Sequence, residues 1–194
     1  FWNNAMLAPG GQNTISPGVE FILPAHEVVI HSTNDPRLPG AGQTISWPYW
    51  QGIDWRYPAN WQGWLGVFAW PKAQLGFAGV YDHIADEGLV RAFDPEQAGG
   101  VKAFGFGPPE HSLPPSLWTD GASRYVELHG GLRPTFGDAY VLAAGTRLEW
   151  EEWWFPLQDM DGLSAAGPSG ALSLRWQAES RQLTARLWPA RPLR

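Results

Sequence analysis

Glycine and proline occur so often along this 194-residue chain that it has little room for long helices. The sequence contains 23 glycines and 18 prolines, and no window of a dozen residues free of both shows a convincing helical period. Segments that alternate every two residues and are rich in β-branched or aromatic side chains dominate instead. We therefore predict an all-β domain, built as an antiparallel sandwich.

Clusters of turn residues separate the segments that we expect to form strands. The opening Phe1-Trp2-Asn3-Asn4 also reads as if the chain began inside a strand, and we expect that it was cut from a longer protein. The predicted strands span residues 19–23, 25–32, 64–70, 75–83, 87–93, 101–106, 123–130, 146–155, 171–177 and 182–188.

The character of the sequence changes after Trp154. Residues 158–170 contain several Gly, Ser and Asp residues, which is typical of a linker. We expect residues 1–157 to form the sandwich domain, and residues 171–194 to form a hairpin or to begin a further module of a longer parent chain. The alternating side chains of the last two strands are Leu172, Leu174 and Trp176 in one, and Leu183, Ala185 and Leu187 in the other.

The charge balance excludes several classes of partner. The net charge is −6, and no cluster of Lys and Arg supplies the basic surface that nucleic acids or anionic membranes attract. No apolar run approaches the roughly 20 residues of a membrane-spanning helix. Cysteine is absent, which excludes disulfides and thiolate chemistry but does not identify a compartment. We predict no nucleic-acid partner, no membrane and no cofactor.

The 13 tryptophans exceed what core packing ordinarily requires. Several fall in residues 33–63, a long aromatic loop, and loops of this length inside a domain are usually functional or disordered. Sugars present C–H faces that stack on flat rings and hydroxyls that need planar polar partners, so we predict a carbohydrate ligand. The alternative is that the rings only fasten the loop to a sheet. The candidate contacts are Trp47, Trp50, Asp54, Trp55 and Arg56.

The segment from residue 124 to 129 gives the sharpest chemical pattern. Strand alternation places Tyr125, Glu127 and His129 on one face, and Val126 and Leu128 on the face toward the core. A carboxylate beside a phenol and an imidazole is a candidate general base. The alternative is a solvated strand face without chemistry.

A second polar pattern is Tyr81-Asp82-His83, followed by Asp86-Glu87. Three acids and a histidine at a strand end suit hydrogen bonding to sugar hydroxyls. Clustered oxygens also suit a hard cation, although we assign no metal site. The alternative is a polar strand end and its turn.

Two further patterns are less informative about chemistry. His26 and His31 lie five apart in a β-rich segment, whereas zinc proteases need two histidines four apart on a helix, so the pattern excludes that site. The alternative that His26 or His31 lines a groove stays open. An acidic and aromatic segment near residue 150 is typical of an edge or surface strand whose rings pack. It interleaves Glu149, Glu151 and Glu152 with Trp150, Trp153 and Trp154.

A series of short motifs occurs in order over about residues 1–157. They are Phe1-Trp2-Asn3-Asn4-Ala5, Ser46-Trp47-Pro48-Tyr49, Gly52-Ile53-Asp54, Trp61-Gln62-Gly63-Trp64-Leu65-Gly66-Val67-Phe68-Ala69, Gly79-Val80-Tyr81-Asp82-His83, Asp86-Glu87-Gly88, Lys102-Ala103-Phe104-Gly105-Phe106-Gly107, Tyr125-Val126-Glu127-Leu128-His129-Gly130-Gly131 and Trp150-Glu151-Glu152-Trp153-Trp154-Phe155-Pro156. Together they resemble a galactose-mutarotase-like family of uncharacterised function, whose domain is often joined to tetratricopeptide repeats.

The resemblance implies a β-supersandwich of which this chain is a fragment, with a sugar held on a concave sheet face. It implies that Glu127 is the counterpart of the mutarotase general base. The mutarotase Asn-His pair would fall near Phe1–Ala5, where this chain has no histidine, so Asn3 is left as a hydrogen-bond partner of the sugar. The candidate acid is then His83 or a group that the sequence does not identify.

Three functional hypotheses follow. The first is a carbohydrate-active, mutarotase-like domain with Glu127 as base. The second is a sugar-binding or structural module without catalysis. The third is a glycoside hydrolase or lyase on the same fold, which needs a second carboxylate such as Asp54 or Asp82.

Overall fold

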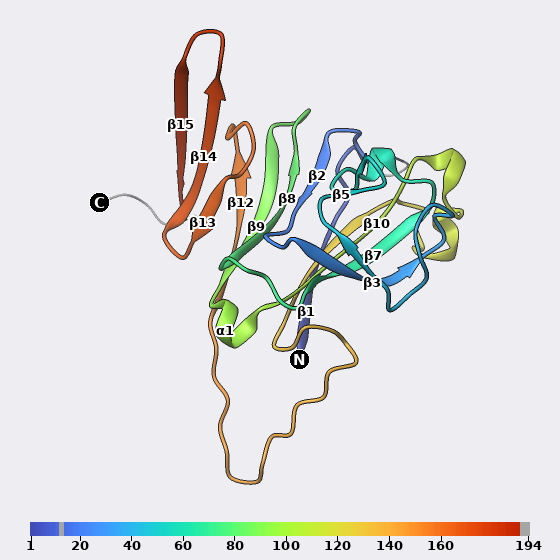
Figure 1. Ribbon diagram of the computed structural model, residues 1–194, viewed down its shortest axis with the longest axis vertical. Coiled ribbons are helices and arrows are strands. Elements are labelled where there is room, and N and C mark those ends of the chain that lie inside the picture. Colours follow the sequence, from blue (N-terminus) through green and yellow to red (C-terminus); the bar gives the residue numbers. More distant parts are fainter. Residues whose placement is uncertain (12–13, 191–194) are drawn as a thin grey trace.

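Two antiparallel sheets, one of six strands and one of four, form the body of the protein (Figure 1). The computed structural model describes residues 1–11 and 14–190. The six-stranded sheet has the order β1-β11-β10-β7-β3-β4, with β1 (Trp2–Leu7), β11 (Val126–Gly131), β10 (Gly100–Phe106), β7 (Trp64–Trp70), β3 (Glu27–Thr33) and β4 (Thr44–Ser46). The four-stranded sheet has the order β12-β9-β8-β2, with β12 (Glu152–Gln158), β9 (Glu87–Phe93), β8 (Phe77–Asp82) and β2 (Val19–Ile22).

The prediction of an all-β antiparallel sandwich is confirmed. Strands β7 and β9 coincide with the predicted segments 64–70 and 87–93, and β12 begins later than the predicted residue 146. Short elements that the pattern did not predict connect the strands. They are β5 (Tyr49–Trp50), β6 (Ile53–Asp54), the helix α1 (Pro95–Ala98) and the 3₁₀ turns η1 (Pro58–Asn60), η2 (Pro109–His111) and η3 (Pro115–Leu117).

The main core lies between these two sheets, because alternate residues of each strand point toward the opposite sheet. On β11 the inward side chains are Val126 and Leu128, which are fully buried. They belong to one hydrophobic cluster with Val80 of β8 and Phe21 of β2. Full burial of an aliphatic side chain of this size contributes about 1.5–3 kcal/mol. The residue between them, Glu127, therefore points to the outer face of the six-stranded sheet.

The rings of the aromatic loop belong mostly to this core. Trp47, Trp55 and Trp61 are buried in the main cluster, and Trp50 packs against it. The indole N–H of Trp61 donates to the carbonyl of Trp55, and that of Trp55 donates to the carbonyl of Trp50, both at 3.1 Å. The loop is thus held to the sandwich by its own tryptophans.

A third sheet, of three strands, packs on the outer face of the four-stranded sheet. It consists of β13 (Ala165–Gly167), β14 (Gly170–Gln177) and β15 (Gln182–Pro189). Met160 and Ala171 are buried there in a cluster with Tyr81 and Val90. The segment 158–170, for which the sequence pattern predicts a linker, therefore contains β13 and contributes to a second core.

Strands β14 and β15 pair as a long hairpin that projects beyond the sandwich (Figure 1). In their register Leu172 lies opposite Leu187, and Trp176 lies opposite Leu183. Within the described residues, no helix has the length and apolar character needed to cross a membrane.

Candidate functional site

Strand β11 carries the candidate base on the outer face of the six-stranded sheet. Glu127 lies opposite Phe104 of β10, and His129 lies opposite Lys102 of the same strand. Lys102 alternates with Val101 and Ala103, which are buried in the main core, so it shares the outer face with Glu127. The antiparallel register thus brings three ionisable side chains together from two neighbouring strands.

These three residues, Glu127, His129 and Lys102, form the Glu127 cluster. Oε2 of Glu127 lies 2.6 Å from Nε2 of His129 and 3.5 Å from Nζ of Lys102, and Nζ lies 3.2 Å from Nε2. The side chains are 14%, 10% and 5% exposed, in the order Glu127, His129, Lys102. Charges this well shielded from water interact more strongly than surface pairs. Strand alternation along residues 124–129 predicted Glu127 and His129, but no sequence pattern pointed to Lys102 as a site residue.

Burial and charge set the ionisation of this cluster. Burial alone would raise the pKa of Glu127, but the hydrogen bond from His129 and the charge of Lys102 outweigh it and hold the pKa below its usual value. Burial lowers the pKa of Lys102 although Glu127 opposes it. Burial, and then Glu127, raises the pKa of Tyr125. Glu127 is therefore an anion at neutral pH.

Burial, followed by the charges of Lys102 and His129, also lowers the pKa of His31, which lies near the cluster on β3. His31 packs edge-on against Phe68 and Phe136. His31 is one of the two histidines for which the sequence left open a place in a groove.

Aromatic rings from two loops flank the cluster. Phe136, from the segment between β11 and β12, lies with its ring centre 5.1 Å from Nζ of Lys102, and Phe104 lies at the same distance. Trp118, from the segment between β10 and β11, packs against Phe104 at 6.2 Å. Phe136 and Trp118 are 46% and 41% exposed, so both present ring surface to solvent beside the buried charges.

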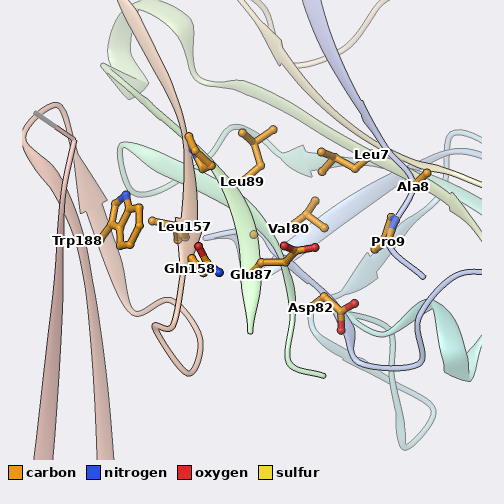
Figure 2. Close-up of a pocket in the computed structure, with 12 residues that line it drawn as sticks. Leu7, Ala8, Pro9, Val80, Asp82, Glu87, Leu89, Leu157, Gln158 and Trp188 are labelled. Atoms are coloured by element: carbon orange, nitrogen blue, oxygen red, sulfur yellow. The ribbon is translucent and has the colours of Figure 1, made fainter. Parts of the chain in front are cut away.

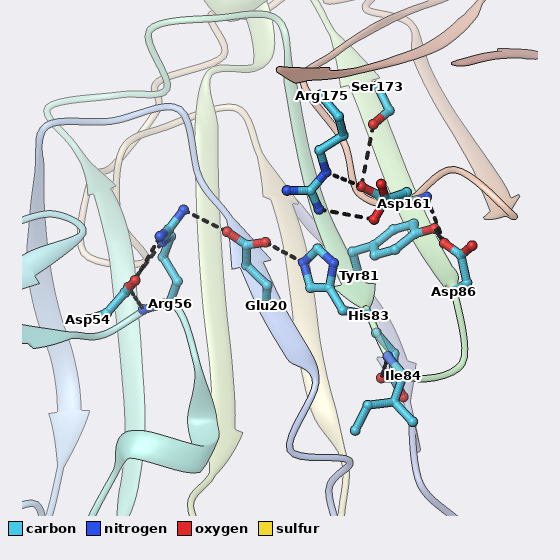
Figure 3. A network of polar contacts seen from close by, with 11 residues as sticks. Glu20, Asp54, Arg56, Tyr81, His83, Ile84, Asp86, Asp161, Ser173 and Arg175 are labelled. Atoms are coloured by element: carbon cyan, nitrogen blue, oxygen red, sulfur yellow. Dashed lines mark hydrogen bonds and ion pairs between the residues drawn. The ribbon is translucent and has the colours of Figure 1, made fainter. Parts of the chain in front are cut away.

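The second predicted pattern lies on the other sheet. Figure 3 shows His83 and Arg56 on either side of Glu20: Nε2 of His83 is 2.7 Å from one carboxylate oxygen, and Nη1 of Arg56 is 2.7 Å from the other. Arg56 also forms two bonds with Asp54, at 2.7 and 3.0 Å. We call Glu20, Asp54, Arg56 and His83 the Glu20 network. Glu20 was not among the predicted site residues.

Tyr81 lies beside this network on the outer face of the four-stranded sheet. Its hydroxyl donates to Asp86, which also accepts from the backbone of Asp161 (Figure 3). The same hydroxyl accepts from the backbone of Met160. These bonds attach the C-terminal segment to the sandwich. His83 directly follows β8 of the four-stranded sheet, whereas Glu127 lies on β11 of the six-stranded sheet. The two residues lie on the outer faces of different sheets, and the structure does not bring them together.

Asn3 points into the sandwich. Its Nδ2 donates to Glu152 at 3.0 Å, and its Oδ1 accepts from the backbone of Gly130 at 3.1 Å. It is thus bonded on the opposite side of the sheet from Glu127.

Asp82 is buried, and its Oδ1 accepts from Ser16 and from the backbone of Ile84 at 2.8 and 2.9 Å. It borders a cavity of about 330 Å³ that Figure 2 shows, together with Glu87 and Leu89. Among the described residues, no group of three or more His, Cys, Asp and Glu side chains is placed to hold a metal ion.

No family model and no curated protein sequence matches the chain. Among solved structures, a TPR-domain containing protein from Parabacteroides distasonis ATCC 8503 is similar over 94% of this chain and 28% of its own, with a TM-score of 0.59 and 22% identity. The Slr1438 protein from Synechocystis sp. PCC 6803 matches over 76% of this chain and 41% of its own, with a TM-score of 0.41 and 13% identity. The chain spans less than a third of the first protein, and that likeness shows a shared fold.

Proposed function

We propose that the outer face of the six-stranded sheet binds a carbohydrate at the Glu127 cluster, and that Glu127 is the base of a mutarotase-like proton transfer. The observation that carries the proposal is a shielded, ionised carboxylate whose neighbours Lys102 and Phe104 contact two rings from loops, Phe136 and Trp118. A carboxylate is an acceptor for sugar hydroxyls, and its bonds are charge-assisted. Phe136 and Trp118 offer exposed faces on which a sugar ring could stack.

Interconversion of sugar anomers needs a second group, because one proton leaves the anomeric hydroxyl while another reaches the ring oxygen. The sequence-based candidate, His83, is bonded to Glu20 on the other sheet. His129 is 2.6 Å from Glu127 and shares its face. We therefore propose His129 as the acid in place of His83.

The hydrolase alternative receives less support. Its second carboxylate was sought in Asp54 and Asp82, but Asp54 is bonded to Arg56 and Asp82 to Ser16. The binding module without catalysis needs the same face and the same rings, so the two remaining hypotheses differ only in what Glu127 does.

Replacement of Glu127 by glutamine separates these hypotheses. We would follow α–β exchange of D-galactose by NMR and binding of methyl β-D-galactopyranoside by tryptophan fluorescence, with Glu151→Gln, at an exposed residue, as control. A catalytic base predicts that Glu127→Gln slows exchange by about 100-fold or more while binding persists.

If wild-type protein does not accelerate exchange and Glu127→Gln only weakens binding, the face is a binding module. If neither sugar, nor D-glucose as a further probe, changes the fluorescence of the wild type, the proposed function is wrong in both forms.

A further inference from the structure

Lys102 is a buried amine to which the proposed function assigns no chemical step. The sequence contains two lysines, Lys72 and Lys102. Lys72 pairs with Glu96 at the surface, where its side chain is 42% exposed. The Lys102 side chain is 5% exposed and lies among aromatic rings. The same chain thus offers an ordinary lysine and an unusual one for comparison.

The contacts of His129 indicate which protonation state of Lys102 is compatible with the cluster. Nε2 of His129 is 2.6 Å from Glu127 and 3.2 Å from Nζ of Lys102. If Nε2 carries a proton, it donates to Glu127, and an ammonium group at Nζ would then face it as a second donor. If Nε2 carries none, it accepts from the ammonium, but the contact with Glu127 then requires a protonated carboxyl group.

The second arrangement removes the hydrogen bond that His129 donates to Glu127, which is the largest of the effects that lower the pKa of Glu127 and does not require a charge on Lys102. In the first arrangement the donor conflict disappears when Lys102 is a neutral amine, because its lone pair then faces the Nε2 proton. Burial also lowers the pKa of Lys102, and it outweighs the opposing effect of the Glu127 carboxylate, which lies 3.5 Å from Nζ. The cluster therefore favours the neutral amine of Lys102 more than an exposed site would.

We propose that Lys102 is a nucleophilic amine that condenses with the aldehyde group of an open-chain sugar or a short hydroxyaldehyde to form an imine. This activity goes beyond anomer exchange and does not depend on recognition of a closed sugar ring.

The reaction balances without an oxidant or reductant. The lone pair of Nζ forms a bond to the carbonyl carbon, and after proton transfer from nitrogen to oxygen a carbinolamine results. The carbinolamine oxygen then leaves as water with a proton from His129, the C=N bond forms, and the imine nitrogen returns its proton to the imidazole. One amine and one aldehyde thus give one imine and one water.

Phe136 lies over the amine and controls the approach of a carbonyl group. Its ring packs against Lys102, His129 and Phe68, and it is still 46% exposed. Because the ring comes from a segment between strands rather than from the sheet, its displacement leaves the backbone pairing of β10 and β11 intact. Its truncation should therefore expose Lys102 without removing any member of the cluster.

Reductive trapping tests the proposal. The full chain would be treated at neutral pH with D-glyceraldehyde and sodium cyanoborohydride, which reduces an imine to a stable secondary amine, and label on each lysine would be followed by peptide mapping. We expect Lys102 to be labelled severalfold faster than Lys72 at neutral pH. The α-amino group is mapped separately, and in urea the two lysines should react alike.

Two variants complete the test. Phe136→Ala should increase labelling of Lys102 and leave that of Lys72 unchanged, whereas Lys102→Met should remove the fast-labelled site. If Lys72 is labelled as fast as Lys102 in both the wild type and Phe136→Ala, the proposal is wrong. Binding of methyl β-D-galactopyranoside, which cannot open to an aldehyde, reports on the proposed function alone, so either idea can fail without the other.

Discussion

Arg91 and Glu152 form an ion pair inside the sandwich, with Nε of Arg91 2.8 Å from Oε2 of Glu152 and side chains 0% and 7% exposed. Arg91 also donates to the carbonyls of Gly100 and Ala98, at 2.9 and 2.8 Å. The same Oε2 accepts from Asn3 on β1, so the pair links the edge strands of both sheets. A buried guanidinium tolerates this position because each of its three nitrogens donates to a fixed acceptor and one of these acceptors carries the counter-charge.

Glu152→Ala should therefore cost much more stability than a surface substitution. It leaves the Arg91 guanidinium buried without its counter-charge, for which a loss of about 3–5 kcal/mol is typical. Chemical denaturation gives the free energy of unfolding, and Glu151→Ala is the matched control because Glu151 is exposed. Equal losses in the two variants would show that the pair does not carry the stability that we assign to it.

The pair also predicts a pH dependence. Burial alone would raise the pKa of Glu152, but the hydrogen bond and charge of Arg91 outweigh it, so the pKa lies below the ordinary 4.5. A depressed pKa contributes stability that is present above the ordinary value and is lost as the pH falls through the folded-state value. The wild type should thus lose stability below pH 4.5, and Glu152→Gln should lose less over the same range. Parallel pH profiles of the urea midpoint in the two proteins would contradict this.

The strands were predictable where the alternation is long enough to be read. β7 and β9 each contain seven residues with regular β patterns and were assigned at the correct bounds. β5 and β6 contain two residues each, too few to show a period. β12 was placed too early because the acidic and aromatic residues before Glu152 continue the same pattern without pairing.

The site was predictable only along one strand. Alternation placed Glu127 and His129 on one face of β11, which the structure shows, but Lys102 is 27 residues from His129 in the sequence. Only the pairing of β10 with β11 brings them together, and a local pattern carries no information about that register. For a similar reason, composition could not distinguish a ring-lined ligand site from the tryptophans that pack in the core.

The burial of the loop tryptophans gives a further prediction. Trp61→Ala should destabilise the protein by about 3–5 kcal/mol, because it leaves a cavity beside Phe21 and Trp55. Trp118→Ala, at a ring that is 41% exposed, should cost far less. Urea denaturation measures both losses, and acrylamide quenching should fall more strongly in Trp118→Ala because an accessible ring is removed. A small loss of unfolding free energy in Trp61→Ala would contradict the assignment of this ring to the core.

Asp86 offers a way to loosen the three-stranded sheet without touching the sandwich core. Its carboxylate accepts from the Tyr81 hydroxyl and from the backbone of Asp161 at 2.7 Å, and lies 3.8 Å from Arg186. Its φ of 54° is left-handed, a conformation that asparagine also tolerates, so Asp86→Asn removes the charge at little backbone cost.

We expect Asp86→Asn to lower the opening free energy of the three-stranded sheet by about 1 kcal/mol, since hydrogen bonds to a charged group exceed those to a neutral one. Hydrogen exchange followed by mass spectrometry should show faster exchange in β13 and β14 and unchanged exchange in β10 and β11. Asp159→Asn is the control: its φ is 56°, and its side chain has no hydrogen bond among the described residues. If both variants exchange alike, or if exchange rises equally in the six-stranded sheet, Asp86 does not act as a local attachment point.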